Sequence, residues 1–198
     1  SLYTSVSLAN SIKLFSKDNN YFTENNYDFL NDTGLIKKYY YNDGLLRPPL
    51  VVNCNYDFMF GSGTTPLRYE LNYRNYFYVT NGSITIKLCS PKYSKYLYKI
   101  SDHEYLEYRS EIDPWNVHKK YLNDFNKVKF LEFTATKGNI IHIPPYWWYS
   151  IKFEPESFIS VFKYKTTFNF ISIIPQLFMQ MLQLQNIKLK ALKQLQTK

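Results

Sequence analysis

Glycine, cysteine and histidine are scarce in this sequence of 198 residues, which contains 6, 2 and 3 of them. With so few glycines, most tight turns must use Asn, Asp, Pro or Ser. The two cysteines, Cys54 and Cys89, form no CxxC pair and have no histidine at ligand spacing. This pattern argues against a disulfide scaffold and against a structural zinc site. It favours a reducing compartment, with one buried disulfide as the alternative.

Long apolar runs are also lacking, and arginine is rare. No stretch of about 18 apolar residues occurs, so the sequence predicts no transmembrane helix. Because it begins with Ser1, a membrane anchor upstream is left open as an expectation. The formal net charge is +8, which favours nucleic acid, an anionic membrane or an acidic partner. Nearly all the basic residues are lysine, whereas forked phosphate recognition prefers arginine, so we do not expect specific nucleic-acid binding.

Aromatic residues are abundant: they make up 19% of the chain, with 20 Tyr and 15 Phe. Such residues favour pleated, half-buried surfaces. Between residues 47 and 170, short alternating runs are separated by turn residues, which is typical of a β-sandwich or barrel. The sequence is therefore predicted to be mainly β, with one barrel domain at 47–170. An irregular arm at 1–46 precedes it, and a helical segment at 171–198 follows.

Two turns are the clearest local signals. Asn81-Gly82 stands between two alternating runs and tolerates the positive φ of a tight hairpin. Pro144-Pro145 is expected to reverse the strand that ends at Ile143.

The end of the chain has a different period. From Pro175 onward, apolar residues recur near helical spacing, which predicts an amphipathic helix with proline in its first turn. We expect this helix to bury Phe178, Met181 and Leu182 against the barrel or a second copy. Three placements are open: it caps the barrel, pairs with a second copy, or lies on a membrane.

A polar, aromatic-rich segment at residues 92–127 interrupts the strands. We expect Trp115 to pack this excursion onto the barrel, because large apolar residues are usually buried. His103 and His118 are expected on its surface.

Two motifs, taken together, carry a resemblance to a known family. TPLRYELNYRNYFYVTNGSITIKLCSP, at residues 65–91, resembles the first half of the metal site of the JmjC-like and cupin-like 2-oxoglutarate oxygenases. In that family a TPLHxD strand leads to an aromatic hairpin. KGNIIHIPPYWWYSI, at residues 137–151, is similar to their later GDxxxIPPGWWHxV. The resemblance covers Pro48 to Lys165 and implies a double-stranded β-helix, the cupin/JmjC-like jelly roll.

The resemblance also places that family's site residues on this sequence. The first iron-binding histidine falls on Arg68, the aspartate on Glu70 and the distal histidine on Tyr149. The lysine that pairs with 2-oxoglutarate falls near Ile84. All four positions depart from the family pattern, so no catalytic residue is assigned.

These replacements do not suit iron. A mononuclear non-haem iron site uses two neutral imidazoles and one carboxylate. Arg68 has a permanent positive charge and no lone pair, and Tyr149 could ligate only as a phenolate. Arg68 and Glu70 share one face of a strand and are predicted to form an internal ion pair, which Tyr149 approaches from a facing strand. We therefore expect no metal and no cofactor, with iron and 2-oxoglutarate as the alternative.

Further residues from the same motifs are candidates for lining the pocket. They are Tyr76, Tyr78, Ile84, His142, Trp147 and Trp148. His142 is interpreted first as an ordinary sheet histidine and second as a metal ligand. Trp147 and Trp148 should lie on opposite faces of their strand.

A narrower resemblance is to cupin-like proteins encoded by large DNA viruses, in which the RYE and YWWYS patterns are themselves typical. It implies a barrel that has lost its iron ligands, often an N-terminal hydrophobic anchor, and a place in host cytoplasm or the virion. The leading hypothesis is a non-catalytic interaction or scaffold module, associated with a virion or membrane. It would bind a protein partner or associate with itself through the C-terminal helix. A divergent metal-dependent 2-oxoglutarate oxygenase and a barrel that binds a small anion beside Arg68 are the alternatives.

Overall fold

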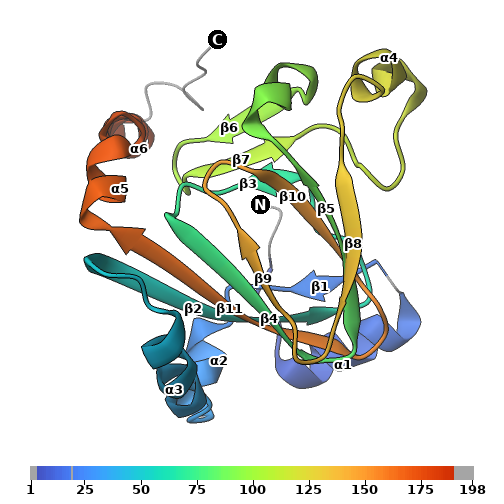
Figure 1. Cartoon of the computed structure of the whole chain (residues 1–198), viewed down its shortest axis with the longest axis vertical. Helices are drawn as coiled ribbons and strands as arrows, with labels where there is room; N and C mark the ends of the chain where they lie inside the picture. The colour runs from blue at the N-terminus through green and yellow to red at the C-terminus, as the bar shows by residue number, and fades with distance from the viewer. Residues whose placement is uncertain (1–3, 19, 190–198) are drawn as a thin grey trace.

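Two antiparallel sheets packed face to face form the body of the protein (Figure 1). The structure is a computed structural model that describes residues 4–18 and 20–189. The strands of the first sheet are β1 (Phe22–Thr23), β2 (Val51–Gly61), β4 (Arg74–Asn81), β9 (Ile140–Ile143) and β11 (Ser157–Thr166). The strands of the second sheet are β3 (Arg68–Tyr69), β5 (Ser83–Cys89), β6 (Lys99–Asp102), β7 (Glu107–Ser110), β8 (Leu131–Thr136) and β10 (Trp148–Phe153). Their spatial orders are β1-β2-β11-β4-β9 and β6-β7-β3-β10-β5-β8. The predicted fold class, a mainly β jelly roll, is confirmed.

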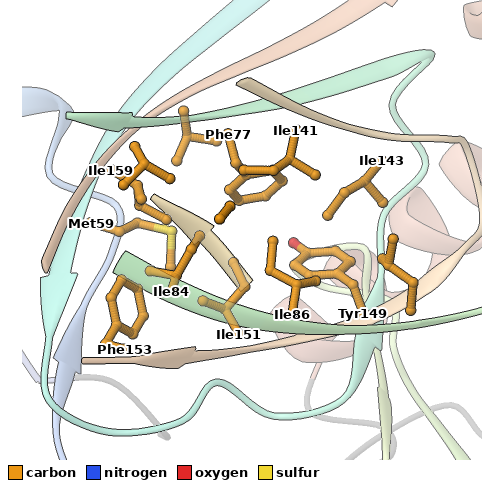
Figure 2. Packing of buried hydrophobic residues seen from close by; sticks show 14 residues of the cluster. Met59, Phe77, Ile84, Ile86, Ile141, Ile143, Tyr149, Ile151, Phe153 and Ile159 are labelled. Carbon is orange, nitrogen blue, oxygen red and sulfur yellow. The ribbon is translucent and has the colours of Figure 1, made fainter. Parts of the chain in front are cut away.

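Alternation along the strands sends apolar side chains into the space between the sheets. On β4, Phe77 and Val79 are fully buried, and on β5 the same holds for Ile84 and Ile86. Figure 2 shows Phe77, Ile84 and Ile86 converging with residues of β9, β10 and β11, including the ring of Tyr149. The interior is therefore largely filled by side chains.

The turn at Asn81-Gly82 forms as predicted, with Gly82 at φ +67°. The predicted hairpin pairing across it is wrong, because β4 lies between β11 and β9 in one sheet and β5 lies between β10 and β8 in the other. The turn carries the chain from the first sheet to the second. Pro144-Pro145 does the same between β9 and β10. Alternation predicts where a strand ends, whereas its pairing partner is decided by contacts distant in sequence.

The N-terminal arm is more regular than predicted, which corrects the expectation of irregular structure. It contains α1 (Leu8–Lys17), α2 (Tyr27–Asp32) and α3 (Ile36–Leu46). α2 and α3 cover the outer face of the first sheet, where Leu30, Ile36 and Tyr39 pack against Tyr56 and Phe162. Short polar helices of this kind are stabilised by tertiary packing more than by intrinsic propensity, so sequence pattern alone did not reveal them.

Substituting Gly82 tests the turn between the sheets. A Cβ on Gly82 would lie 2.5 Å from the Oγ and 2.9 Å from the Cα of Ser157. Positive φ adds backbone strain, so Gly82→Ala is expected to cost about 1–3 kcal/mol of unfolding free energy. A Cβ on Gly44, inside α3, would meet nothing within 4 Å beyond the backbone of its own helix. Gly44→Ala is the matched control and should stabilise by about 0.5–1 kcal/mol. Thermal denaturation measures both, and equal melting shifts would contradict this assignment.

The excursion does not only interrupt the strands, as predicted: it supplies β6 and β7 at one edge of the second sheet, and other parts of it cover the outer face of that sheet. Its helical turns are η1 (Pro91–Tyr96), η2 (Lys119–Tyr121) and α4 (Leu122–Phe125). The indole N–H of Trp115 donates to the Oγ of Ser150 on β10 at 2.7 Å, which confirms that Trp115 packs the excursion onto the barrel. His118 is exposed as predicted, but His103 is buried, so its predicted surface placement is wrong.

Two helices follow β11 and lie at one edge of the barrel (Figure 1). They are α5 (Thr167–Ser172) and α6 (Ile174–Leu189). α6 begins one residue before Pro175, which confirms the predicted helix. Phe178 and Met181 are 54% and 48% exposed, so their burial against the barrel is wrong, whereas burial against a second copy stays a prediction. Leu182 is partly buried. The rest of the predicted helix, 190–198, lies outside the described residues.

Candidate functional site

The residues predicted to occupy the metal position meet at one end of the barrel interior. In the antiparallel pair of β3 and β10, Arg68 lies directly opposite Tyr149, so the two side chains share a face. Both are buried, and the guanidinium carbon of Arg68 lies 5.6 Å from the centre of the Tyr149 ring. Tyr149 therefore reaches the site from the neighbouring strand and not, as predicted, from a facing one.

The carboxylate that pairs with Arg68 is Glu24. The two terminal nitrogens of the guanidinium donate to the two oxygens of Glu24, with 2.8 Å between Nη1 and Oε1. The side chains of Arg68 and Glu24 are only 7% and 4% exposed, so this is a buried, forked ion pair. Glu24 follows β1 and precedes Arg68 by 44 residues. Nothing in the polar run SKDNNYFTENN marks it as an interior residue.

Glu70 has a different set of partners. One carboxylate oxygen lies 3.0 Å from the Nζ of Lys163 and accepts a hydrogen bond from the Tyr149 hydroxyl. The other accepts from the amide of Asn72 at 2.6 Å. The predicted ion pair between Arg68 and Glu70 is thereby corrected: each of these residues pairs with a side chain from another part of the chain.

Lys163 was missed by the sequence analysis, although a signal was present. It lies on β11, where Ile159 and Val161 face the interior. Every second residue of a strand shares a face, so the same alternation places Lys163 inside the barrel.

A third carboxylate, that of Asp57 on β2, fixes the segment that carries Glu24. Its two oxygens accept the backbone N–H groups of Asn25 and Asn26 at 2.8 and 2.7 Å. These residues follow Glu24 directly, so the bonds hold Glu24 against its partner. Burial raises the pKa of Asp57, while Lys163 and the two N–H groups oppose that shift.

Around Glu70, the pKa shifts keep the carboxylate negatively charged and the Lys163 ammonium positively charged at neutral pH. Burial alone would raise the pKa of Glu70, but Lys163 and Arg68 outweigh it and the pKa is lowered. Burial alone would lower the pKa of Lys163, but Glu70 reverses this and the pKa is raised. Burial raises the pKa of Tyr149 well above its ordinary value. We call Glu24, Asp57, Arg68, Glu70, Tyr149 and Lys163 the interior cluster.

The interior cluster does not fit an iron centre. Within residues 4–18 and 20–189, no three His, Cys, Asp or Glu side chains come together in a way that could hold a metal ion. Arg68 can only donate hydrogen bonds. The raised pKa of Tyr149 moves its phenolate further from neutral pH. The oxygens of Glu70 already accept from three neighbouring side chains.

Of the predicted pocket residues, Ile84 and Trp148 are buried and Trp147 is partly buried, and they lie on two different sides of the second sheet. Ile84 lies in the interior, and Trp147 is partly buried against the same apolar group. Trp148 faces outward and is buried beneath the excursion, where its indole N–H donates to Ser94 at 2.8 Å. The prediction that Trp147 and Trp148 take opposite faces is consistent with this arrangement, but Trp148 does not line the interior.

The other three predicted pocket residues lie on the outer side of the first sheet. Tyr76 and Tyr78 pack against the cluster that α2 and α3 cover. His142 pairs with Tyr76 across β9 and β4, and the two rings are 5.2 Å apart. The residue is exposed on this outer face. The pKa of His142 is lowered, first because its ring loses part of its contact with water and second because Arg74 is positively charged. None of the three faces the barrel interior, which corrects their assignment as pocket residues.

A cavity of about 510 Å³ lies beside β6 and β7 and contains no residue of the interior cluster in its wall. Arg109 on β7 contributes to its wall, lies opposite Arg68 in the sheet and pairs with Glu107. The other charged residues of the wall are Asp102, Glu111 and Asp113. Among the described residues of its wall, four carboxylates stand against one guanidinium, which makes this cavity unfavourable for a small anion.

A family model described as a cupin-like domain matches residues 53–170, more than half of the chain. The chain belongs to the cupin-like family. Among solved structures, this cupin-like chain is similar to hydroquinone 1,2-dioxygenase from Sphingomonas sp. TTNP3 with 4-hydroxybenzoate bound. The identity is 13% and the TM-score 0.38, and the match covers 57% of this chain and 59% of that one. No curated protein sequence gives a significant match.

Proposed function

We propose that this protein is a non-catalytic cupin-like barrel that acts as an interaction or scaffold module. One observation carries the proposal: the positions aligned with the family's iron ligands are part of an internally paired charge cluster. Arg68 is paired with Glu24, and Glu70 is paired with Lys163. A side chain that already has a buried partner must lose it before it can bind anything else, and separating such a pair is costly.

The charge balance of the cluster also weighs against the small-anion alternative. Within the part of the chain that the structure describes, three carboxylates, from Glu24, Asp57 and Glu70, lie around the two cationic side chains. An added anion would have to displace carboxylates of the protein from Arg68 and Lys163.

The setting proposed for the module is a reducing compartment, in host cytoplasm or a virion as the viral resemblance implies. Cys54 and Cys89 are both free thiols. Burial is the main cause that raises their pKa values, to about 11 for Cys54 and about 12 for Cys89. Thiols of this kind are mostly protonated at neutral pH and react slowly, which suits structural and not catalytic cysteines.

Metal analysis and turnover of the unmodified protein test the proposal. Protein purified without chelator and then incubated with Fe(II) is expected to retain far less than one equivalent of iron. It should release no succinate from 2-oxoglutarate above a heat-denatured control. Equimolar iron that is lost in Glu70→Ala, together with succinate release, would instead establish the divergent oxygenase.

A further inference from the structure

The side of α6 that meets the barrel is only partly apolar. Leu177 packs there against the group that contains Ile173, and the next residue in contact is Gln180, whose amide donates to the Glu104 carbonyl at 2.8 Å. Gln183 and Asn186 are only 2% and 8% exposed. A helix whose surroundings were this barrel and water would turn its apolar residues inward and its amides outward.

The outward side of α5 and α6 is apolar instead. Its exposed large apolar residues are Phe168, Phe170, Ile171, Ile174, Phe178, Met181, Leu184 and Ile187. Ile174, Phe178 and Met181 follow one another at helical spacing and so form one stripe. Exposed apolar residues scattered singly are normal, but a contiguous group of this size marks a contact surface.

The charges of the same region indicate what the surface contacts. All 16 Asp and Glu residues precede position 157, so the last 42 residues of the sequence contain no acidic side chain. Two of the six lysines in this stretch, Lys163 and Lys165, lie on β11, and Lys163 is paired with Glu70 inside the barrel. The other four follow the apolar stripe in the sequence: Lys188 is exposed near the end of α6, and three more come after it. An apolar helix face followed by lysines, on a segment without carboxylates, matches the boundary between anionic headgroups and acyl chains.

We propose that the outer face of α5 and α6 binds the surface of an anionic lipid bilayer. Within the described residues, no helix is long and apolar enough to cross a membrane, so the contact is along the surface. α6 has 16 residues, and a helix of that length spans about 24 Å, enough to lie along the interface with several apolar side chains inserted. A second copy is a poorer fit, because two carboxylate-free, lysine-bearing segments would repel each other.

Vesicle co-sedimentation tests this surface, which is separate from the interior cluster, so the result does not depend on whether the barrel is catalytic. The protein should sediment with phosphatidylcholine/phosphatidylserine vesicles at least about tenfold more strongly than with phosphatidylcholine alone, and less at high salt. Phe178→Glu/Met181→Glu should lower binding to the anionic vesicles by about tenfold or more. Lys188→Glu, which leaves the apolar stripe intact, should lower it by a smaller factor.

The matched control is Tyr41→Glu/Leu45→Glu, which places the same charges on two exposed apolar residues of α3. Its binding to the anionic vesicles should fall only slightly, because the two added negative charges are repelled by the anionic lipids. Light scattering on each variant reports the oligomeric state, and far-UV circular dichroism reports folding. The proposal is overturned if neither vesicle type binds, or if both double variants lose binding equally. It is also overturned if a dimer forms that Phe178→Glu/Met181→Glu dissociates, because the face then belongs to a second copy.

Discussion

Replacing Glu70 by alanine is expected to lower the free energy of unfolding by about 3–5 kcal/mol. The substitution removes the carboxylate that pairs with Lys163 and accepts the Tyr149 hydroxyl, both of which lie inside the barrel. An ammonium group left without its partner in a low-dielectric interior is far less stable than the original pair. Chemical denaturation of the variant and the unmodified protein measures the difference.

Glu132→Ala is the matched control for this result. Glu132 also pairs with a lysine, since its carboxylate lies 3.6 Å from Lys87, but its side chain is 53% exposed. Exposed pairs contribute about 0–1 kcal/mol. If the two alanine variants lost the same stability, Glu70 would not be part of a buried ion pair.

The pH dependence of stability gives a second measure of the same carboxylate. Because the folded-state pKa of Glu70 is lowered, its stabilisation is complete above the unfolded-state pKa of about 4.3 and is lost as the pH falls through the lower folded value. Lys163 has a raised pKa. Its contribution to the free energy of unfolding is therefore complete below about pH 10.4 and is lost as the pH rises through the folded-state pKa. In Glu70→Gln, the free energy of unfolding should therefore change less with pH in both the acidic and the alkaline range. A variant with unchanged pH dependence would contradict the pairing.

Rebuilding the family's ligand set is expected to convert the interior cluster into an iron site. The three substitutions are Arg68→His, Glu70→Asp and Tyr149→His. On their own they should bind Fe(II) weakly, because they leave Glu24 without its guanidinium and keep the Lys163 ammonium close to the new metal. Adding Glu24→Gln and Lys163→Met removes both charges. The fivefold variant should then bind about one equivalent of Fe(II), at least about tenfold more tightly than the threefold variant.

Anaerobic Fe(II) titration, read by equilibrium dialysis, measures this gain. Glu24→Gln/Lys163→Met without the new ligands is the control and should bind no more iron than the unmodified protein. A fivefold variant that is folded but binds no iron would show that the backbone of β3 and β10 has moved away from the ligand geometry of the related enzymes.

The sequence predicted the parts of this protein that depend on local pattern. Alternating apolar residues and turn chemistry located the strands on either side of Gly82 and Pro145, and the spacing from Pro175 located α6. What the sequence did not predict depends on contacts between distant residues. Glu24 and Lys163 could not be assigned to Arg68 and Glu70, because a strand pattern tells which face a side chain takes but not which charge it will meet there.

The surface that covers the apolar stripe of α6 could not be predicted for a related reason. Phe178 and Met181 were expected to be buried against the barrel or a second copy, since apolar burial usually stabilises a helix. They are exposed in the structure, so burial against the barrel is wrong and burial against a second copy stays a prediction. The spacing of apolar residues is equally regular whichever surface covers them.

The ion pair between Glu24 and Arg68 has a consequence for how the chain folds. The charges of the interior cluster come from Glu24, Asp57, Arg68, Glu70 and Lys163, which span almost 140 positions of the sequence. A nascent chain that ends before β11 lacks the ammonium for Glu70, and a fragment that starts at residue 47 lacks the carboxylate for Arg68. Either would have to bury an unbalanced charge. Synthesis on the ribosome should therefore leave the barrel open until β11 has emerged, after which both ends of the chain close it in one cooperative step.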